Sequence, residues 1–381
     1  MNFELTEEQA LLQQTVRRFA EEEVAPGAIE RDESKIWPED IVRQLGEMGL
    51  MGMMVPDKWG GAGMDTVAYT IAMEEICRAD ASVGVIMSVN NSLVCSLLHT
   101  FGTDDQKDKY LTPLARGEQL GAFSLSEPQA GSDASNLLCR AERDGDGYRV
   151  SGTKNWVSNG QHSDVVLLFA LTDPEKKHKG ISCFIVEKGW SGFSVGKPED
   201  KLGIRASDTT ELYLDEVKVP VENRIGGEGD GFRIALATLD GGRIGIAAQA
   251  LGIAQAALDH ALAYAQEREQ FGHQIVDFQA IQFKLADMAT EVEAARLLVR
   301  RAAFVKDRGD SASSAAAMAK VFASEAAMKA ATQCVQIHGG YGYMRETGVE
   351  RLMRDAKITQ IYEGTSEIQR VVIARELQRK G

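Results

Sequence analysis

The periodicity of apolar residues changes twice along this chain, and the order of the changes restricts the fold. From Leu5 to about Gly117 apolar residues recur at helical spacing. After Gly121 short β-branched and aromatic blocks replace them, and from Phe232 the helical period returns in long segments. Strands and helices do not alternate, which disfavours a Rossmann-like sheet. The sequence predicts a mainly α fold with a central β domain.

We expect several domains, because 381 residues exceed the size at which one core usually stops growing. The changes in periodicity place a helical domain at residues 1–120, a β domain at 121–228 and a second helical domain at 229–381. Long helical segments separated by short polar breaks are typical of a helix bundle. The last domain is therefore predicted to be a bundle.

Charge and cysteine content exclude several classes of function. The formal net charge is -14 at pH 7. Binding to a phosphate backbone relies on clustered Lys and Arg, so nucleic acid is disfavoured as a partner. The five cysteines lie far apart without a CxxC pair, which favours a reducing compartment over a zinc site or a redox pair. HExxH and P-loop motifs are absent, and we predict no metal site.

No segment of the sequence reads as a membrane span or a secretory signal. The N-terminus, MNFELTEEQALLQQTVRRF, lacks a basic region followed by an apolar one. No run approaches the roughly 20 apolar residues that a membrane span needs. We predict a cytoplasmic protein without membrane contact, and a mature mitochondrial matrix protein that begins at a new Met1 is the alternative.

One carboxylate, Glu363, lies in the stretch QIYEGTSEIQ at a break between two helical patterns. Gly364 breaks the first pattern, and Ser366 with Gln369 three residues later forms a capping-box pattern for the next helix. In such a joint a carboxylate often only faces water, and spacing alone favours that alternative. An apolar pocket would instead raise the pKa of the carboxyl and make it a useful general base.

Two stretches near the β domain carry side chains suited to a polar cofactor. AFSLSEPQAGSDAS, residues 122–135, combines Gly131 with several hydroxyls at an irregular strand end, which can anchor a flavin ring edge or a pyrophosphate. KNWVSNG, residues 154–160, places Trp156 and Ser158 on one side of an extended backbone, where an indole can cover an aromatic ring. An ordinary Ser/Gly/Pro loop and a core tryptophan stay open as alternatives.

Three further stretches offer contacts to a ligand. Arg268 follows a long helix and can pair with a phosphate, and Gly339 and Gly340 would let a ligand approach the backbone. DGGR, residues 240–243, places two glycines in an apolar helix, which either kink the helix or admit a ligand. A solvated charge and a helix C-cap are the alternatives, and His338 is predicted to be a hydrogen-bonded structural residue.

The wording and order of these motifs resemble one family. LTEEQ, FSLSEPQAGSDAS, NWVSNG, DKLGIR, REQFG, QIHGGYGY and RDAKITQIYEGTSEIQR are similar to acyl-CoA dehydrogenase motifs over essentially the whole chain. VIMSVNNSL and TLDGGRIGIAAQALGIAQAALD look most like the short-chain, butyryl-CoA branch. The resemblance implies an N-terminal α-helical domain, a middle β-barrel or β-sandwich domain and a C-terminal four-helix bundle.

The resemblance also implies an activity, the FAD-dependent α,β-dehydrogenation of butyryl-CoA to crotonyl-CoA with electrons passed to an electron-transferring flavoprotein. Glu363 matches the family's catalytic base, which removes the α-proton while a hydride leaves the β-carbon for the flavin. The residues that match acyl-CoA contacts are Ser132, Asp240, Arg243 and Gly364. Those that match FAD contacts are Phe123, Leu125, Ser126, Gly131, Ser132, Trp156, Val157, Ser158, Arg268, Gln270, Gln279, Gln336, Ile337, His338, Gly339, Gly340, Thr365, Ser366 and Glu367.

The resemblance further implies a homotetramer in which several FAD contacts reach a neighbouring subunit's cofactor. Gly242 occupies the position where the isovaleryl branch carries its base, which supports Glu363 in that role. WVSN replaces the family's frequent WITN but keeps a hydroxyl at Ser158. A branched short-chain acyl-CoA dehydrogenase and a non-catalytic FAD-binding relative stay open as alternatives. The acyl-chain cutoff depends on the packing of Ile86, Met87, Asn90 and Leu93, which spacing does not reveal.

Overall fold

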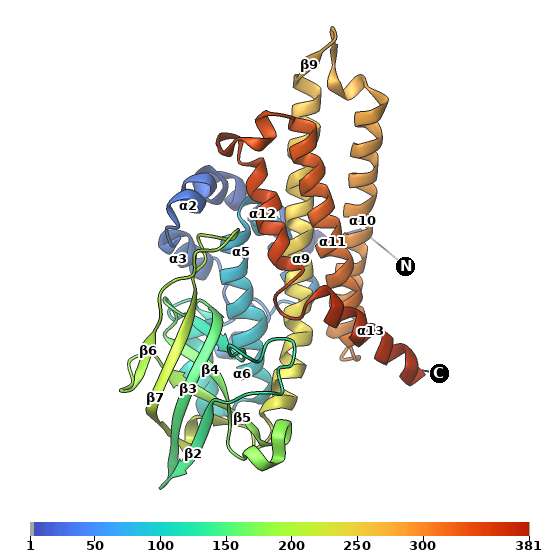
Figure 1. The fold of residues 1–381 in the computed structure, drawn as a ribbon. Coiled ribbons are helices and arrows are strands. Elements are labelled where there is room, and N and C mark those ends of the chain that lie inside the picture. Colours follow the sequence, from blue (N-terminus) through green and yellow to red (C-terminus); the bar gives the residue numbers. More distant parts are fainter. Residues whose placement is uncertain (1–3, 381) are drawn as a thin grey trace.

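The computed structural model describes residues 4–380 and shows helices, then a sheet, then helices again in chain order (Figure 1). The predicted fold class is confirmed. Residues 1–3 and 381, at the ends of the first and last predicted domains, lie outside the described part of the chain. The exact boundaries between the three domains stay predictions.

The first region is built from helices that pack around one apolar core. A capping box starts its first helix, because Gln9 N donates to Thr6 Oγ1 (3.2 Å) and Thr6 N donates to Gln9 Oε1 (3.2 Å). Its α-helices are α1 (Glu7–Phe19), α2 (Ala28–Ser34), α3 (Glu39–Glu47), α4 (Thr66–Ala79), α5 (Ala81–Ser88), α6 (Ser96–Phe101), α7 (Asp104–Gln106) and α8 (Thr112–Ala115).

One continuous run of this region, Ala81–Phe101, is long and apolar enough to cross a membrane, so the expectation that no such run exists is wrong. The run consists of α5, the π-helical segment η4 (Val89–Cys95) and α6. Within it, 94% of the apolar window is buried inside the protein. Helices buried on all sides are apolar all round, and this run forms a core helix.

The middle region is a mixed sheet of eight strands in the order β6-β7-β3-β2-β4-β5-β8, with β1 paired to β4. β1 and β2 run parallel to β4, and the other neighbours are antiparallel. A tight turn with Gly145 at φ 61° joins β2 to β3. The strands are β1 (Gly121–Ser124), β2 (Arg140–Asp144), β3 (Gly147–Ser158), β4 (Val165–Leu171), β5 (Ile181–Glu187), β6 (Phe193–Val195), β7 (Thr209–Pro220) and β8 (Arg224–Ile225).

The last region is a bundle with a short hairpin at its far end (Figure 1). Its longest helix has 37 residues and is therefore about 55 Å long. The helices are α9 (Gly231–Glu267), α10 (Gln279–Asp307), α11 (Ser313–His338), α12 (Val349–Thr359) and α13 (Ser366–Lys380), and the hairpin is β9 (Glu269–Gln270) with β10 (His273–Gln274).

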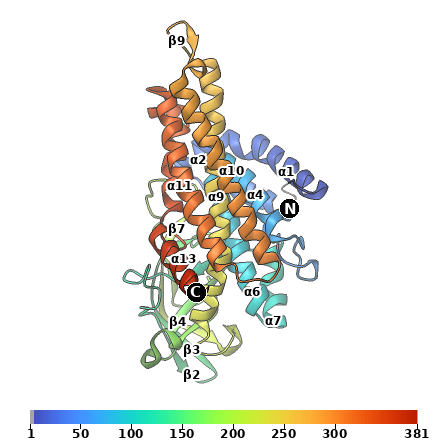
Figure 2. The same ribbon diagram turned by 90° about the vertical axis from the view of Figure 1, so that its right-hand side faces the viewer.

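Helix α4 of the first region packs alongside α9 and α10 of the bundle (Figure 2). Three ion pairs cross this contact, the longest of them between Arg300 Nη2 of α10 and Glu74 Oε2 at 3.9 Å. Arg296 Nη2 of α10 lies 2.9 Å from Glu74 Oε1, and Arg78 Nε of α4 lies 2.7 Å from Asp259 Oδ2 of α9. The N-terminal helices and the C-terminal bundle thus share one contiguous core.

Asn90 joins the helical core to the first strand of the sheet. Its Nδ2 donates to Met51 O (2.9 Å) and Leu114 O (3.0 Å), and its Oδ1 accepts from Gly121 N (3.0 Å). Asn159, just after β3, donates from Nδ2 to Gly121 O (3.2 Å). These bonds hold the ends of β1 and β3 against η4, which in turn packs on α9.

Candidate active site

The turn between α12 and α13 holds Glu363 in a conformation that most residues avoid. The φ angle is 52° at Glu363 and 94° at Gly364, both in the left-handed region. A residue other than glycine pays about 1–2 kcal/mol there, so its surroundings must hold it. A backbone hydrogen bond from Ser366 N to Gln360 O (2.9 Å) closes the turn.

The predicted capping box at the start of α13 is wrong. The helix begins at Ser366 itself, whose buried Oγ has no hydrogen-bond partner among the described residues. Thr365 caps the helix instead, because its Oγ1 accepts from Ile368 N (3.3 Å). The side chain of Gln369 is turned toward the preceding turn, where Nε2 donates to Gly364 O (2.7 Å).

Glu363 is half-buried, with one carboxyl oxygen turned toward α9. Its Oε2 is buried and has no hydrogen-bond partner within residues 4–380. Burial raises the pKa of the carboxyl to about 7, against the opposing charges of Lys320 and Arg243. Glu363 is therefore not a solvated turn residue, and its pKa lies where a general base at neutral pH needs it.

Gly242 of α9 makes room for this carboxyl. A Cβ at this position would lie 2.1 Å from Glu363 Oε2 and 2.7 Å from Leu93 Cδ2. Helix α9 continues without a break through Gly241 and Gly242. The glycine pair in DGGR thus lets another group approach the helix and does not end it.

Lys320 of α11 fixes the turn from the opposite side, and the sequence analysis missed it. Its Nζ donates to Thr359 O (3.0 Å) and to Gly364 O (2.8 Å), and the side chain is fully buried. The signal in the sequence was a lysine on the alanine-rich face of a helix, SSAAAMAKVFASEAAMKAA. Only the fold shows that this face meets the Glu363 turn.

The residue before Glu363 is also anchored. Tyr362 donates its hydroxyl hydrogen to Gln249 Oε1, and Gln249 Nε2 donates to Ala81 O (3.0 Å). Burial raises the pKa of Tyr362 well above its usual value, so the phenol stays neutral. The turn is therefore tied to α9 and through it to α5.

Leu93 lies next to the carboxyl, and two hydroxyls lie against the following turn of α9. Of the residues expected to set the depth of an acyl pocket, Leu93 lies beside the Glu363 side chain, whereas Asn90 is engaged in the contact between domains. Tyr69 OH lies 3.0 Å from Ser88 Oγ. Both oxygens lie against α9, since a Cβ at Gly245 would be 2.6 Å and 2.7 Å from them.

A cavity of about 250 Å³ opens between α9 and α13. Arg243 Nη1 donates to Asp240 Oδ1 (2.6 Å), and Ser313 Oγ donates to the same oxygen (3.0 Å). Arg375, Arg379 and Glu376 also line the cavity, and Arg379 Nη1 lies 2.8 Å from Glu376 Oε1. The structure thus brings two of the predicted acyl-CoA contacts, Asp240 and Arg243, into one charged cavity beside Gly242, and places Gly364 in the turn.

The strand ends of the sheet carry the first set of predicted FAD contacts. The Trp156 indole is 61% exposed, and Asn155 N donates to Ser126 O (2.9 Å), which brings this end of β3 next to the loop at 125–139. Trp156 has φ 59° at a shift in register with β7, so the predicted extended backbone is wrong there. The predicted residues carried by β1, the loop and β3 are Phe123, Leu125, Ser126, Gly131, Ser132, Trp156, Val157 and Ser158.

A buried ion pair holds the loop at 125–139 onto β3. Lys154 Nζ lies 2.8 Å from Glu127 Oε1 and also donates to Leu125 O (3.0 Å). Glu127 in turn accepts from Leu138 N (2.6 Å) and Cys139 N (3.1 Å). Burial raises the pKa of Glu127, but Lys154 and these N–H donors outweigh it and hold the pKa below its usual value.

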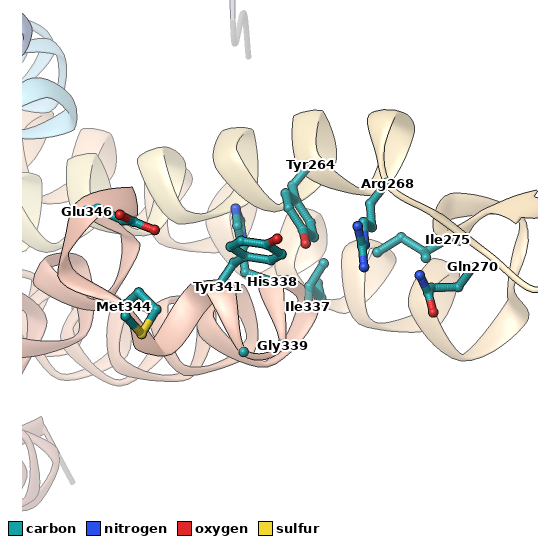
Figure 3. Close-up of a pocket in the computed structure, with 11 residues that line it drawn as sticks. Tyr264, Arg268, Gln270, Ile275, Ile337, His338, Gly339, Tyr341, Met344 and Glu346 are labelled. Atoms are coloured by element: carbon teal, nitrogen blue, oxygen red, sulfur yellow. The ribbon is translucent and has the colours of Figure 1, made fainter.

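A second set of predicted FAD contacts lies at the far end of the bundle. Figure 3 shows Tyr264 and Arg268 at the end of α9 facing His338 and Tyr341. His338 Nδ1 donates to Cys334 O (2.8 Å), which confirms the expected hydrogen-bonded histidine. Around a cavity of about 530 Å³ the structure collects Arg268, Gln270, Ile337, His338, Gly339 and Gly340. Gln279 begins α10 and Gln336 lies in the last turn of α11, and neither lines this cavity.

The two sets of predicted FAD contacts are far apart within one chain. At about 1.5 Å per residue, Arg268 lies roughly 39 Å from Gly242 along α9. The strand ends and the Glu363 turn lie toward the other end of that helix (Figure 1). A single copy of the chain therefore keeps the residues at the hairpin away from the predicted base.

Models of all three acyl-CoA dehydrogenase domains match the chain in order. The N-terminal domain model matches residues 6–118, the middle domain model 122–217 and the C-terminal domain model 229–378. The chain belongs to the acyl-CoA dehydrogenase family. It is an oxidoreductase of this family, and its cofactor is a flavin.

Individual relatives match this acyl-CoA dehydrogenase over its full length. It is 51% identical over 379 residues to the short-chain specific acyl-CoA dehydrogenase of Clostridium acetobutylicum, with 100% of both chains covered. The structure of butyryl-CoA dehydrogenase from Megasphaera elsdenii superposes with a TM-score of 0.98, 47% identity and 100% coverage of both chains. A chain in a structure described as the electron transferring flavoprotein of Acidaminococcus fermentans superposes with a TM-score of 0.98, 50% identity and the same coverage.

The residues at the strand ends of this acyl-CoA dehydrogenase fit a flat ring with a polar edge. The Trp156 indole presents an exposed face, and the space next to Gly131 is open, since a Cβ there would meet nothing within 4 Å. At the start of α13 the buried Ser366 Oγ still lacks a partner. An unpaired buried hydroxyl is costly unless a ligand or water satisfies it, which is consistent with a flavin at this place.

Proposed function

We propose that this enzyme dehydrogenates a short-chain acyl-CoA, butyryl-CoA to crotonyl-CoA, with Glu363 as the base that removes the α-proton. The observation that carries the proposal is the Glu363 carboxyl, whose Oε2 is buried without a protein partner among the described residues and whose pKa is about 7. A pKa near the working pH keeps a useful fraction of the carboxylate ionised and still favours uptake of the proton.

The turn and its neighbours position this base for proton transfer. Oε2 has no hydrogen bond within the protein to break when it takes the α-proton. Gly364 carries no side chain, so the thioester can lie against the turn, and a Cβ there would also lie 2.6 Å from Gln369 Nε2. When bound, FAD supplies the acceptor for the hydride that leaves the β-carbon.

FAD contacts are assigned to two places on the chain. The residues at the strand ends, with Thr365, Ser366 and Glu367 at the start of α13, would hold the flavin ring of the chain's own active site. Arg268 and its neighbours at the hairpin would hold phosphate or adenine of the FAD bound to a neighbouring subunit. The separation of roughly 39 Å along α9 supports this division, because one extended cofactor cannot serve both places in a single chain.

The preference for a short acyl chain is supported by the filling of the space beside Glu363. Leu93 lies next to the carboxyl, and Tyr69 with Ser88 packs against α9 one turn further on. All three side chains are buried. The short-chain and butyryl-CoA names of the full-length relatives point to the same substrate class. Asp240 and Arg243 in the cavity between α9 and α13, and Ser132 in the loop at 125–139, are assigned to the acyl-CoA.

An electron acceptor, an oligomeric state and a cellular location are proposed together with this function. The structure described as an electron transferring flavoprotein supports such a flavoprotein as the electron acceptor. The hairpin residues, which lie far from the chain's own Glu363, support a homotetramer. The five buried, unpaired cysteines fit a cytoplasmic enzyme.

The substrate assignment is tested by comparing initial rates on butyryl-, isobutyryl-, 2-methylbutyryl- and hexanoyl-CoA with an artificial electron acceptor. We expect the highest kcat/KM on butyryl-CoA, and the Glu363→Gln enzyme gives the background rate. Faster turnover of either branched thioester would replace the proposal with a branched-chain dehydrogenase. A folded, colourless preparation that ignores every thioester would instead support a non-catalytic relative.

A further inference from the structure

Lys320 is a buried ammonium group whose hydrogen bonds go to backbone carbonyls alone. Its side chain is 0% exposed, and none of the ion pairs within residues 4–380 includes it. The other fully buried lysine, Lys154, is paired with Glu127 at 2.8 Å. An ammonium without a carboxylate partner is costly to bury, and here two carbonyls offset that cost. The role of the lysine therefore depends on where these carbonyls lie.

The two carbonyls that bind Lys320 stand on either side of the predicted base. Thr359 O, at 3.0 Å, belongs to the last residue of α12, where carbonyls lack helical partners and the helix dipole attracts a cation. Gly364 O, at 2.8 Å, directly follows Glu363 and also accepts from Gln369 Nε2 (2.7 Å). Lys320 therefore ties both ends of the turn to α11.

We propose that Lys320 is a positioning residue for the base: its ammonium fixes the turn that carries Glu363, and its charge favours the ionised carboxylate. The inference rests on the proposed role of Glu363 as the base. It assigns two effects to one side chain, a geometric effect through Thr359 O and Gly364 O and an electrostatic effect on the carboxyl.

The charges around the carboxyl give the electrostatic effect its sign. Lys320 of α11, Arg243 of α9, Tyr69 of α4 and Tyr362 of the turn face it. Burial raises the pKa of Glu363 to about 7, while Lys320, followed by Arg243, lowers it. Burial lowers the pKa of Lys320 to about 8, so near pH 7 the lysine is still mostly charged. Removing that charge must therefore raise the pKa of Glu363.

The test is the pH profile of kcat/KM for butyryl-CoA in Lys320→Met, which keeps the length of the side chain but removes its charge. We expect the acid limb to move up by about one pH unit, the lower end of the effect of a close opposite charge. At pH 6 the variant then loses roughly tenfold more activity than at pH 9, where Glu363 is ionised in either enzyme. Lys320→Gln keeps a donor without the charge and gives the same shift, which covers a Met variant that does not fold.

Gln369→Leu is the matched control. It removes the other side-chain donor to Gly364 O and leaves the Lys320 charge in place. We expect kcat to fall. The acid limb of the pH profile should stay at the pH found in the unaltered enzyme. An equal shift in this variant would mean that loosening the turn, and not loss of charge, moves the pKa, and it would overturn the electrostatic part of the proposal.

A second readout does not depend on turnover. The infrared carboxyl signal that disappears in Glu363→Gln holoenzyme is followed with pH in the unaltered enzyme and in Lys320→Met. We expect its midpoint to rise by the same unit in the variant. If neither the midpoint nor the acid limb moves, Lys320 does not tune the base. If Glu363→Gln keeps full activity, the proposed base fails, while the infrared midpoint still reports whether Lys320 acts on Glu363.

Discussion

At the scale of single residues, burial decides what Glu363 can do. The same carboxyl in water has a pKa of 4.5, and burial raises it to about 7. The sequence identified the residue through the resemblance of QIYEGTSEIQ, but local pattern alone favoured a solvated turn. Oε2 of this carboxyl lies against α9 at Gly242, which is far from Glu363 in the sequence, so the pattern around Glu363 does not predict its burial.

The raised pKa predicts a stability cost at high pH. The unfolded chain releases the Glu363 proton near pH 4.5 and the folded chain near pH 7, so folding stability falls as the pH rises through this window. The difference amounts to at most about 3 kcal/mol. Glu363→Gln is therefore expected to raise the thermal unfolding temperature at pH 8 and to leave it nearly unchanged at pH 4.5. A gain of equal size at both pH values would contradict the buried, ionisable carboxyl.

Gly242 is predicted to be intolerant of a side chain. In Gly242→Ala the new Cβ would lie 2.1 Å from Glu363 Oε2, so the carboxyl must move, and a shift of about 1 Å costs on the order of a hundredfold in kcat/KM. Gly241→Ala is the control, because its Cβ would lie 2.8 Å from the end of the Lys306 side chain and at an ordinary contact distance of 3.6 Å from Ser92 O. Both variants gain about 1 kcal/mol of helix propensity. Equal activity in the two variants, measured with butyryl-CoA, would show that the carboxyl does not lie against α9.

At the scale of elements, the sequence predicts the long helices of the bundle and the β domain, because their apolar periodicity persists over many residues. The local details were not. The left-handed Trp156 depends on a register shift between β3 and β7, and the cap of α13 moved to Thr365 because Gln369 is used by the turn. Serines and asparagines interrupt the apolar run Ala81–Phe101, which hides it in the sequence, although the fold buries all of them except Ser96.

The ion pair between Lys154 and Glu127 is predicted to hold the loop at 125–139 in place on β3. Glu127→Ala leaves a buried ammonium unpaired and should cost about 3–5 kcal/mol. The Glu127→Gln, Lys154→Met double variant removes both charges and should be less destabilised than Glu127→Ala. Thermal unfolding and the ratio of flavin to protein absorbance measure both effects. If the loss of stability in the double variant equals the sum of the losses in Glu127→Gln and in Lys154→Met, the two side chains act independently.

At the scale of the whole molecule, the residues predicted to bind FAD form two sets, which lie toward opposite ends of α9. Resemblance predicted both sets of FAD contacts, and only the fold shows that roughly 39 Å of α9 separates them. The periodicity of one chain does not tell whether another subunit covers the cavity at the hairpin. The proposed homotetramer gives the hairpin residues a neighbour's cofactor to bind.

Arg268→Ala tests this assembly. We expect the variant to lose at least tenfold in FAD affinity, although Arg268 lies roughly 39 Å from the Glu363 side of α9, because a charge-assisted phosphate contact contributes about 1.5–3 kcal/mol. Arg308→Ala, an exposed arginine just beyond the other end of α10, is the control and should keep its flavin. Equal flavin content in the two variants, measured by absorbance after gel filtration, would remove Arg268 from FAD binding.

The central claim, that Glu363 is the base of a short-chain acyl-CoA dehydrogenase, is tested most directly by anaerobic titration of the purified enzyme with butyryl-CoA. The flavin absorbance of the unaltered enzyme should bleach as butyryl-CoA is added. Glu363→Gln should keep its flavin and its yellow colour throughout the titration. Bleaching of the Glu363→Gln enzyme at the rate and extent of the unaltered one would contradict the account.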